Sequence, residues 1–299
     1  MTLTGQPKQL RPLEPRRHEA LLCAYRQAVA ERRRSLALGA ALVCLLIVVT
    51  TWVGEVKPTT LLSNAWRVGD FLGRTLPQLS LATIGADVAE WYWGLDRWLA
   101  LLGETLLIAY AGTLLGAAGA LALCFLAAAN LTPSRTMVFT ARRVMEICRT
   151  VPELVFALTF VIAFGLGPMP GVLALVIHSM GALGKLFAEV VENIDMRPVE
   201  GVSASGANRL ETIRYAVLPQ VFPTFASYTL LRFEVNVRGA AIMGFVGAGG
   251  IGQELLEAVR KFYYTDISAI VLLIALTVML IDLCSERLRH RLFDTRVVQ

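Results

Sequence analysis

Charged residues are scarce in this sequence. Of its 299 residues, 17% are Asp, Glu, Lys or Arg and 56% are hydrophobic, whereas soluble domains usually carry about 25% charged residues. The mean hydropathy of +0.59 arises from long apolar runs separated by short charged stretches. This pattern excludes a soluble globular protein and predicts an all-α polytopic membrane protein, with no room for a large soluble domain.

Paired cysteines and enzymatic motifs are also missing. The sequence has no CxxC pair, so neither a disulfide framework nor a metal site is indicated. It has no GxxxxGK[ST] phosphate loop, because Gly184-Lys185 lacks the earlier glycine and is followed by Leu186. No HExxH, GxSxG or paired-carboxylate arrangement stands out. We therefore expect a chain that is not an enzyme and leaves any ATP hydrolysis to another polypeptide.

Features of a cleavable signal and of a nucleic-acid-binding protein are absent too. About 35 polar residues precede the first apolar run and no A-x-A site follows it, so we expect this run to stay as an anchor. The net charge is +5. Because the basic residues flank apolar runs, membrane topology explains this charge better than nucleic acid does.

Six apolar runs are candidates to cross about 30 Å of hydrocarbon. The expected spans are 36–53, 99–129, 144–166, 172–187, 218–246 and 267–284. The tryptophans of residues 54–97 favour a membrane–water interface, which predicts an interfacial loop with short amphipathic helices. The second span contains Gly112 and Gly116 in a GxxxG pattern, which either allows close helix packing or reflects a composition rich in glycine and alanine.

Lys and Arg are denser on one side of these spans. If the N-terminus is cytoplasmic, the cytoplasmic segments hold Arg32, Arg33, Arg34, Arg135, Arg142, Arg143, Arg197, Arg209, Arg214, Arg287, Arg289 and Arg291. The external loops then hold Lys57, Arg67, Arg74, Arg97, Arg260 and Lys261. The positive-inside rule therefore predicts that both termini and the polar insert 188–217 lie in the cytoplasm.

The polar insert has the signals of two short helices. Pro198 suits the first turn of one helix, and Asn208 with Glu211 forms a capping box for the second. Gly206 lies between them, where a turn requires positive φ, and Pro219 is expected to end a helix and open the next span. Such an insert is either a docking surface or a solvated helical linker.

The spacing of residues 200–219 resembles the EAA loop of ABC-importer membrane subunits. That pattern is E-A-A, three residues, G, nine residues and I-x-L-P; here it reads Glu200-Gly201-Val202, Gly206 and Ala216-Val217-Leu218-Pro219. Gly201 and Val202 replace alanines and Ala216 replaces isoleucine, which leaves the fit to a partner open. The resemblance implies a type I importer fold in which this loop enters a cleft of the ATPase. The implied coupling residues are Glu200, Gly201, Val202, Ser205, Gly206, Ala207, Leu210, Leu218 and Pro219.

Three longer blocks are similar to the phosphonate ABC-transporter permeases, a group that includes phosphite and hypophosphite importers. The blocks are 148–178, FAEVVENIDMRPVEGVSASGANRLETIRYAVLPQVFP and RFEVNVRGAAIMGFVGAGGIG. The resemblance implies a homodimer in the bacterial cytoplasmic membrane, two ATPase subunits and a periplasmic or lipid-anchored binding protein. The implied cargo is a phosphonate-type anion, carried by alternating access. ATP and Mg would bind the partner subunit, and no cofactor would bind this chain.

The apolar runs and the resemblance together predict a division of the chain. Residues 1–35 form a cytoplasmic segment, 36–97 the first transmembrane helix with an external interfacial loop, and 293–299 a cytoplasmic tail. Residues 98–292 form the permease transmembrane domain, with the coupling loop at 188–219.

The fifth apolar run carries an unusual strip of polar residues, Arg232, Glu234, Asn236 and Arg238. Placing a charged side chain near the centre of a bilayer costs on the order of several kcal/mol unless the charge is paired or hydrated. Glu234 and Arg238 are four residues apart and can meet on one helix face, and Arg232 and Asn236 share a neighbouring face. The strip either lines a translocation path or subunit interface, or forms a structural ion pair. His178 is a further path candidate, Lys185 suits snorkelling, and Glu153 is placed at the cytoplasmic mouth.

Residues 247–252 formally match GxGxxG, but a dinucleotide site needs a preceding strand, and here a membrane span precedes. We expect Gly247, Gly249 and Gly250 to form flexible or tightly turned backbone at the outer end of the fifth span. If that turn faces the path, its N–H groups could hold phosphonate oxygens.

Three alternatives stay open at this point. The first is an ABC permease for another small solute, such as methionine or an amine osmolyte. The second is a secondary transporter that uses its acidic residues as ion relays and needs no ATPase. The third is a membrane enzyme, which no constellation of residues favours.

Overall fold

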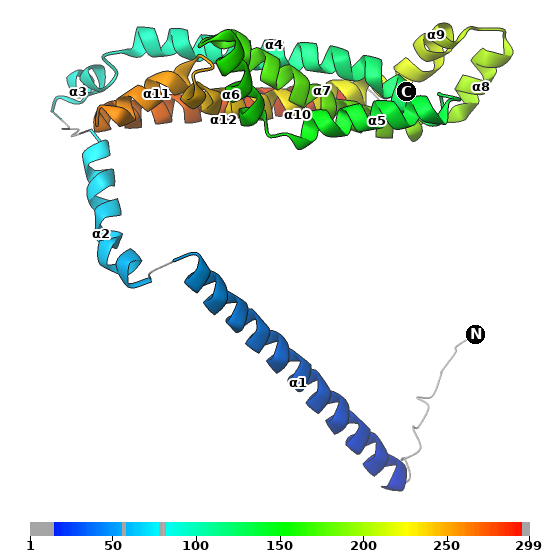
Figure 1. The fold of residues 1–299 in the computed structure, drawn as a ribbon, viewed down its shortest axis with the longest axis horizontal. Helices are drawn as coiled ribbons and strands as arrows, with labels where there is room; N and C mark the ends of the chain where they lie inside the picture. The colour runs from blue at the N-terminus through cyan, green and yellow to red at the C-terminus, as the bar shows by residue number, and fades with distance from the viewer. Residues whose placement is uncertain (1–14, 56–57, 78–79, 81, 295–299) are drawn as a thin grey trace, which may run out of the picture. The chain divides into compact units, whose positions relative to one another are not determined.

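The computed structural model describes residues 15–55, 58–77, 80 and 82–294, and these form helices and turns without a strand (Figure 1). The chain divides into two compact units, Met1–Asp70 and Phe71–Gln299. The first holds α1 (Pro15–Val53) and most of α2 (Pro58–Thr75). The expected span 36–53 is the C-terminal part of α1, whose apolar stretch Tyr25–Val53 has no buried residue.

Helices do occur in the expected interfacial loop. They are the rest of α2 and the short α3 (Ile84–Trp91), and α3 has no buried residue. Indole N–H groups tie this region to the start of α12 (Tyr264–Asp294): Trp91 donates to the Ser268 hydroxyl at 3.1 Å and Trp93 to the Asp266 carboxylate at 3.2 Å. The indoles are thus polar anchors at one end of the second unit.

The core of the second unit is the pair α4 (Leu95–Ala127) and α7 (Pro168–Glu192). Glycines allow the two helices to approach closely. A Cβ added at Gly112 would lie 2.5 Å from Leu175 Cβ, and one at Gly116 would lie 2.7 Å from Ser179 Cβ. The GxxxG pattern therefore marks close packing, because only glycine leaves space for the facing helix.

The expected span 144–166 is not one straight helix. The structure has two helices there, α5 (Arg135–Thr150) and α6 (Glu153–Phe164), which meet at an angle of 82°. Val151 and Pro152 form the break. Proline has no N–H for the helical ladder and disfavours helical backbone at the preceding residue, so an apolar run does not continue as one helix across it.

The expected boundary of the fourth span is also corrected, because α7 runs on to Glu192, five residues beyond the predicted end at 187. Phe187, Ala188 and Val191 are buried in an apolar cluster that extends this helix. The Glu192 carboxylate pairs with Arg142 at 2.5 Å. Burial on one face and an ion pair on the other thus make residues 188–192 helical, and the polar insert begins at Asn193.

The two helices predicted for the insert are present. The first, α8 (Met196–Ala204), begins after Asp195, whose carboxylate accepts the Arg197 N–H at 3.0 Å, and Pro198 lies in its first turn. Gly206 has φ +88°. The second helix, α9 (Arg209–Thr212), has both hydrogen bonds of the predicted Asn208–Glu211 capping box. Local signals therefore determine this segment.

Pro219 opens the next long helix, as expected, but no helix ends before it. A π-helical turn, η1 (Ile213–Val217), joins α9 directly to α10 (Leu218–Met243), and Pro219 lies in the first turn of α10. Proline lacks the N–H that would reach the carbonyl four residues earlier, and a wider π turn accommodates such a local mismatch. The neighbouring Gln220 side chain donates to the Ala216 carbonyl at 2.7 Å, which satisfies a carbonyl next to the proline.

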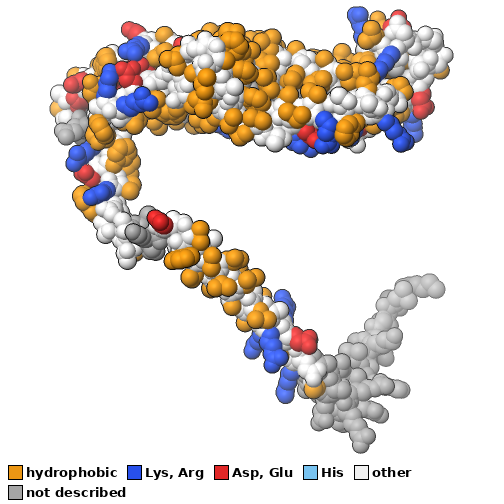
Figure 2. Space-filling view, viewed as in Figure 1, with side chains coloured by type: hydrophobic (Ala, Val, Ile, Leu, Met, Phe, Trp, Pro, Cys, Tyr) orange, Lys and Arg blue, Asp and Glu red, His pale blue; other side chains and the backbone are white. Residues whose placement is uncertain are grey.

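After α10 the chain forms η2 (Gly244–Val246), α11 (Ile251–Arg260) and α12. Among the described helices, α1, α4, α7 and α12 are long and apolar enough to cross a membrane, and the bent pair α5–α6 adds a fifth candidate. The 26-residue α10 is of similar length but carries charges along its middle. The predicted count of six spans is therefore approximate. In the second unit, Figure 2 shows hydrophobic side chains over the middle of the bundle and charged ones at both ends.

Candidate functional site

A polar cluster lies where α4, α7 and α10 meet, midway along the helices. Arg232 donates through Nε to Ser179 Oγ at 3.1 Å, and Asn236 donates through Nδ2 to the same oxygen at 2.9 Å. Asn236 also donates to Thr113 Oγ1 at 2.8 Å. The predicted shared face of Arg232 and Asn236 is confirmed. Ser179 and Thr113 were missed, although each adjoins a feature that the sequence shows, the histidine and the GxxxG pattern.

Glu153 joins this cluster from the first turn of α6. Its Oε2 lies 3.6 Å from Arg232 Nη2 and 3.9 Å from His178 Nε2. The other ring nitrogen of His178, Nδ1, lies 3.1 Å from the Val151 carbonyl and must donate to it, because a carbonyl only accepts. The bend between α5 and α6 thus brings together three residues that the sequence presents as separate candidates.

The cluster is enclosed but not sealed. Asn236 is fully buried, whereas 13% of the Arg232 side chain, 18% of His178 and 25% of Glu153 are exposed. Two buried polar atoms in the cluster, Arg232 Nη2 and Asn236 Oδ1, have no hydrogen-bond partner among the described residues. Buried polar groups usually have partners, so this cluster has unused capacity for binding.

Glu234 and Arg238 do not pair with each other, although their spacing allows it. Glu234 lies 3.3 Å from Arg289, and Arg238 lies 2.6 Å from Asp282, with both partners on α12. Residues four apart on one helix can meet, but here opposite charges on the neighbouring helix take their place. These two pairs fasten α10 to α12 rather than facing the Arg232 cluster.

The glycine-rich stretch after α10 is a tight turn, which was one of the two conformations expected for it. Gly247, Gly249 and Gly250 all have positive φ, between +77° and +87°. A Cβ at Gly250 would lie 2.3 Å from Thr105 Oγ1, which itself accepts the Ile251 N–H at 2.9 Å. Backbone packed against α4 therefore explains Gly250, whereas a Cβ at Gly247 would meet Leu166. A Cβ at Gly249 would lie 2.8 Å from a Glu104 carboxylate oxygen, so an acidic group faces the turn.

The predicted coupling segment projects from one end of the bundle (Figure 1). Glu200, Gly201, Ser205, Gly206, Leu210 and Pro219 are exposed, and Val202, Ala207 and Leu218 are partly buried. Leu210 is 77% exposed, a large apolar surface for the tip of a polar insert. Arg209 holds α9 to the bundle by donating to Thr132 Oγ1 at 2.8 Å. An anchored segment with an exposed apolar tip is suited to docking.

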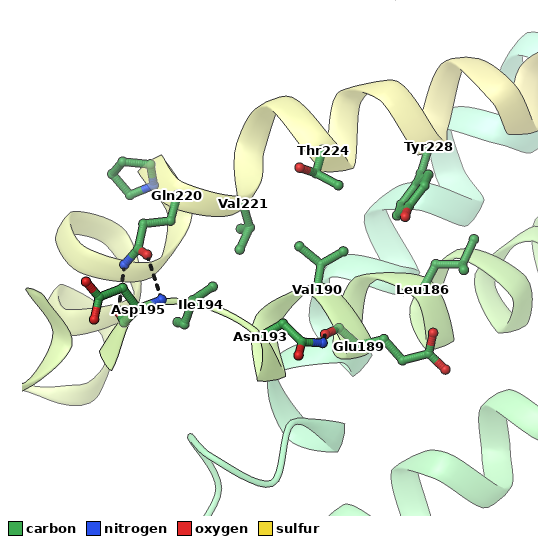
Figure 3. A pocket seen from close by; sticks show the side chains of 11 residues that line it. Leu186, Glu189, Val190, Asn193, Ile194, Asp195, Gln220, Val221, Thr224 and Tyr228 are labelled. Carbon is green, nitrogen blue, oxygen red and sulfur yellow. Dashed lines mark hydrogen bonds between the residues drawn. The ribbon is translucent and has the colours of Figure 1, made fainter. Parts of the chain in front are cut away.

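A cavity of about 740 Å³ adjoins this segment, between the end of α7 and the start of α10 (Figure 3). Asp195 and Gln220 close one side of it through two hydrogen bonds of 3.2 Å each. Glu189 of α7 and Asn193, which follows it, face Thr224 and Tyr228 of α10 across the cavity. The cavity therefore opens between the two helices that carry the polar cluster.

A family model described as the inner membrane component of binding-protein-dependent transport systems matches residues 125–299. The chain belongs to this family. It is therefore a multi-pass inner-membrane protein and the membrane component of a binding-protein-dependent ABC transporter, which has a transport role rather than an enzymatic one. The resemblance drawn from the coupling segment is confirmed at this level.

Relatives of this permease narrow the group. The phosphite transport system permease PtxC of Stutzerimonas stutzeri is 38% identical over 250 residues, 83% of this chain and 86% of the relative. The phosphate-import permease PhnE of Mycolicibacterium smegmatis is 37% identical over 83% of this chain and 44% of its own length. A cryptic phosphonate permease of Escherichia coli, PhnE2, is 56% identical over 39% of this chain and 96% of its own length.

Solved structures agree with the permease fold. A MetNI methionine transporter structure covers 65% of this permease and 95% of its own chain, with a TM-score of 0.56 at 20% identity. An alginate transporter in complex with its periplasmic protein covers 88% and 96%, with a TM-score of 0.54 at 14% identity. At such identities only the fold is shared, and it is that of type I ABC-importer permeases, which work with ATPase and substrate-binding partners.

Proposed function

We propose that this permease imports phosphonate or a related phosphorus oxyanion such as phosphite or hypophosphite. The observation that carries the proposal is the 38% identity to a phosphite permease over 86% of that protein. Arg232 in the polar cluster supports the proposal, because a buried Nη2 without a hydrogen-bond partner suits an anion with several oxygens.

We further propose the assembly around the chain. Two copies form one translocation path, two ATPase subunits bind on the cytoplasmic side, and a periplasmic or lipid-anchored binding protein delivers the anion. Both termini face the cytoplasm, as the distribution of Lys and Arg supports. ATP and Mg bind the ATPase, and this chain itself carries no cofactor.

The coupling segment transmits the ATPase motion in this proposal. Its exposed residues, Glu200, Gly206 and Leu210 among them, contact the ATPase, and closure of the ATPases moves α8 and α9. The permease domain 98–292, with its coupling loop at 188–219, then alternates between outward and inward access. His178, Arg232 and Asn236 lie on the path, whereas Glu234 and Arg238 hold α10 against α12.

The test is a purified complex of permease, ATPase and binding protein in proteoliposomes. Phosphite, hypophosphite, methylphosphonate, phosphate and methionine are supplied separately, and both ATP hydrolysis and uptake are measured. We expect at least one reduced phosphorus anion or phosphonate to stimulate both. Stimulation by phosphate alone refutes the proposed cargo and favours the cargo named for the mycobacterial relative PhnE. Stimulation by methionine alone also refutes it.

A further inference from the structure

The Glu153 carboxylate faces Arg232 and His178 without a hydrogen bond to either. Its separations of 3.6 Å and 3.9 Å from the two nitrogens exceed the usual N–H···O limit of about 3.2 Å. Arg232 Nη2, on the side that faces Glu153, has no hydrogen-bond partner among the described residues. The charges are balanced here, but the hydrogen-bonding capacity of the guanidinium is not used.

The groups around this gap are held in place by other contacts. Ser179 Oγ fixes the guanidinium through Nε at 3.1 Å, and because it also accepts from Asn236 at 2.9 Å, its hydroxyl hydrogen is left to donate. The Val151 carbonyl fixes His178 by accepting from Nδ1, so in the neutral ring Nε2 lies toward Glu153 as an acceptor, and the donors at this gap are Arg232 and Ser179. Groups fixed in this way need little reorganisation to bind a ligand.

We propose that Arg232 and Ser179 form an oxyanion-binding station within the permease, and that the Glu153 carboxylate occupies this station when no cargo is present. The inference rests on the proposed transport of a phosphorus oxyanion. The incoming anion replaces the Glu153 carboxylate, so Arg232 always has a negative partner. An unpaired buried charge would cost on the order of several kcal/mol. Glu153 is then an internal competitor that keeps binding weak enough for release.

Glu153 can withdraw from the station. It is the first residue of α6, where the positive end of the helix stabilises a carboxylate, and a quarter of its side chain is exposed. Gly239 leaves space for its other oxygen, since a Cβ there would lie 2.7 Å from Oε1. The 82° bend beside it places this carboxylate at the junction of two helices rather than within one.

Direct binding of phosphite tests the station. The complex of permease and ATPase is placed in lipid nanodiscs without binding protein, and phosphite binding is measured by equilibrium dialysis. Glu153→Gln keeps the shape of the side chain and removes its charge, so we expect about tenfold tighter binding, a ratio that corresponds to about 1.4 kcal/mol. Arg232→Gln should abolish binding. Glu146→Gln, which removes the carboxylate of an exposed pair with Arg143, should leave binding unchanged.

The outcomes separate this inference from the transport proposal. Binding by Glu153→Gln that is absent, unchanged or weaker than wild type overturns the station, as does normal binding by Arg232→Gln. If Glu153→Gln fails to assemble, Glu153→Asp keeps the charge but shortens its reach, and binding no tighter than wild type again overturns the inference. Uptake by the wild-type complex with its binding protein is measured in parallel. Uptake of a phosphorus oxyanion without the Glu153 effect leaves the transport proposal standing alone.

Discussion

Two glycines in the coupling segment should respond in opposite ways to the same substitution. Gly201 lies inside α8 and Gly206 lies in the turn after it, and a Cβ added at either meets nothing within 4 Å. Steric contacts are therefore equal in Gly201→Ala and Gly206→Ala. The two positions differ in backbone conformation, because Gly206 has φ +88° whereas Gly201 is helical.

The backbone difference sets the size of each effect. Alanine in left-handed backbone costs about 1–2 kcal/mol, so Gly206→Ala should destabilise the segment by that amount. Alanine inside a helix is favoured over glycine by about 1 kcal/mol, so Gly201→Ala should stabilise α8. Gly201→Ala also restores the alanine of the EAA pattern, and we expect it to preserve coupling.

Hydrogen exchange of the complex in nanodiscs measures both effects locally. Peptides that cover residues 196–212 should exchange about fivefold more slowly in Gly201→Ala and roughly 5- to 30-fold faster in Gly206→Ala. Ligand-stimulated ATP hydrolysis should fall only in Gly206→Ala. Slower exchange in both variants would refute the reasoning, because it would mean that residue 206 does not hold positive φ in the assembled protein.

Two further predictions concern the helix bundle. Gly112→Ala should lower the stability of the bundle in detergent by about 1–3 kcal/mol through overpacking against Leu175, whereas Gly103→Ala on the same helix, with nothing within 4 Å, should not destabilise it; equal thermal shifts would contradict this packing. Arg238→Asp should impair assembly by placing two acidic groups together, and the added Asp282→Arg should restore it; an inactive but fully assembled single variant would instead favour a role of Arg238 in the path.

The parts that sequence could predict are those that local chemistry determines. The Asn208–Glu211 capping box and the positive φ of Gly206 depend on residues within one turn, and both were predicted. The break at Pro152 also had its signal, but the apolar run around it was read as one continuous span. Hydropathy reports whether a segment prefers lipid and does not report where its axis changes direction.

The parts that sequence could not predict depend on neighbouring helices. Glu234 and Arg238 satisfy the spacing rule for a pair, yet charges on α12 attract each of them more closely. The cluster of Glu153, His178 and Arg232 joins residues that are up to 79 positions apart in the sequence, from 153 to 232. Each residue could be nominated separately, but their meeting depends on the bend of α6 and on the glycines that bring α4 to α7.

The π turn at Ile213–Val217 connects the end of the polar insert directly to the helix that carries the polar cluster. Because α9, η1 and α10 follow without a break, residues 209–243 form one continuous helical stretch. Arg232 and Arg209 both lie on this stretch, so in the proposed coupling a displacement of α9 reaches the polar cluster through helical backbone alone. The π turn also sets the rotation of α9 about the helix axis relative to α10. Loss of one residue in this turn would rotate α9 by about 100° relative to the polar cluster.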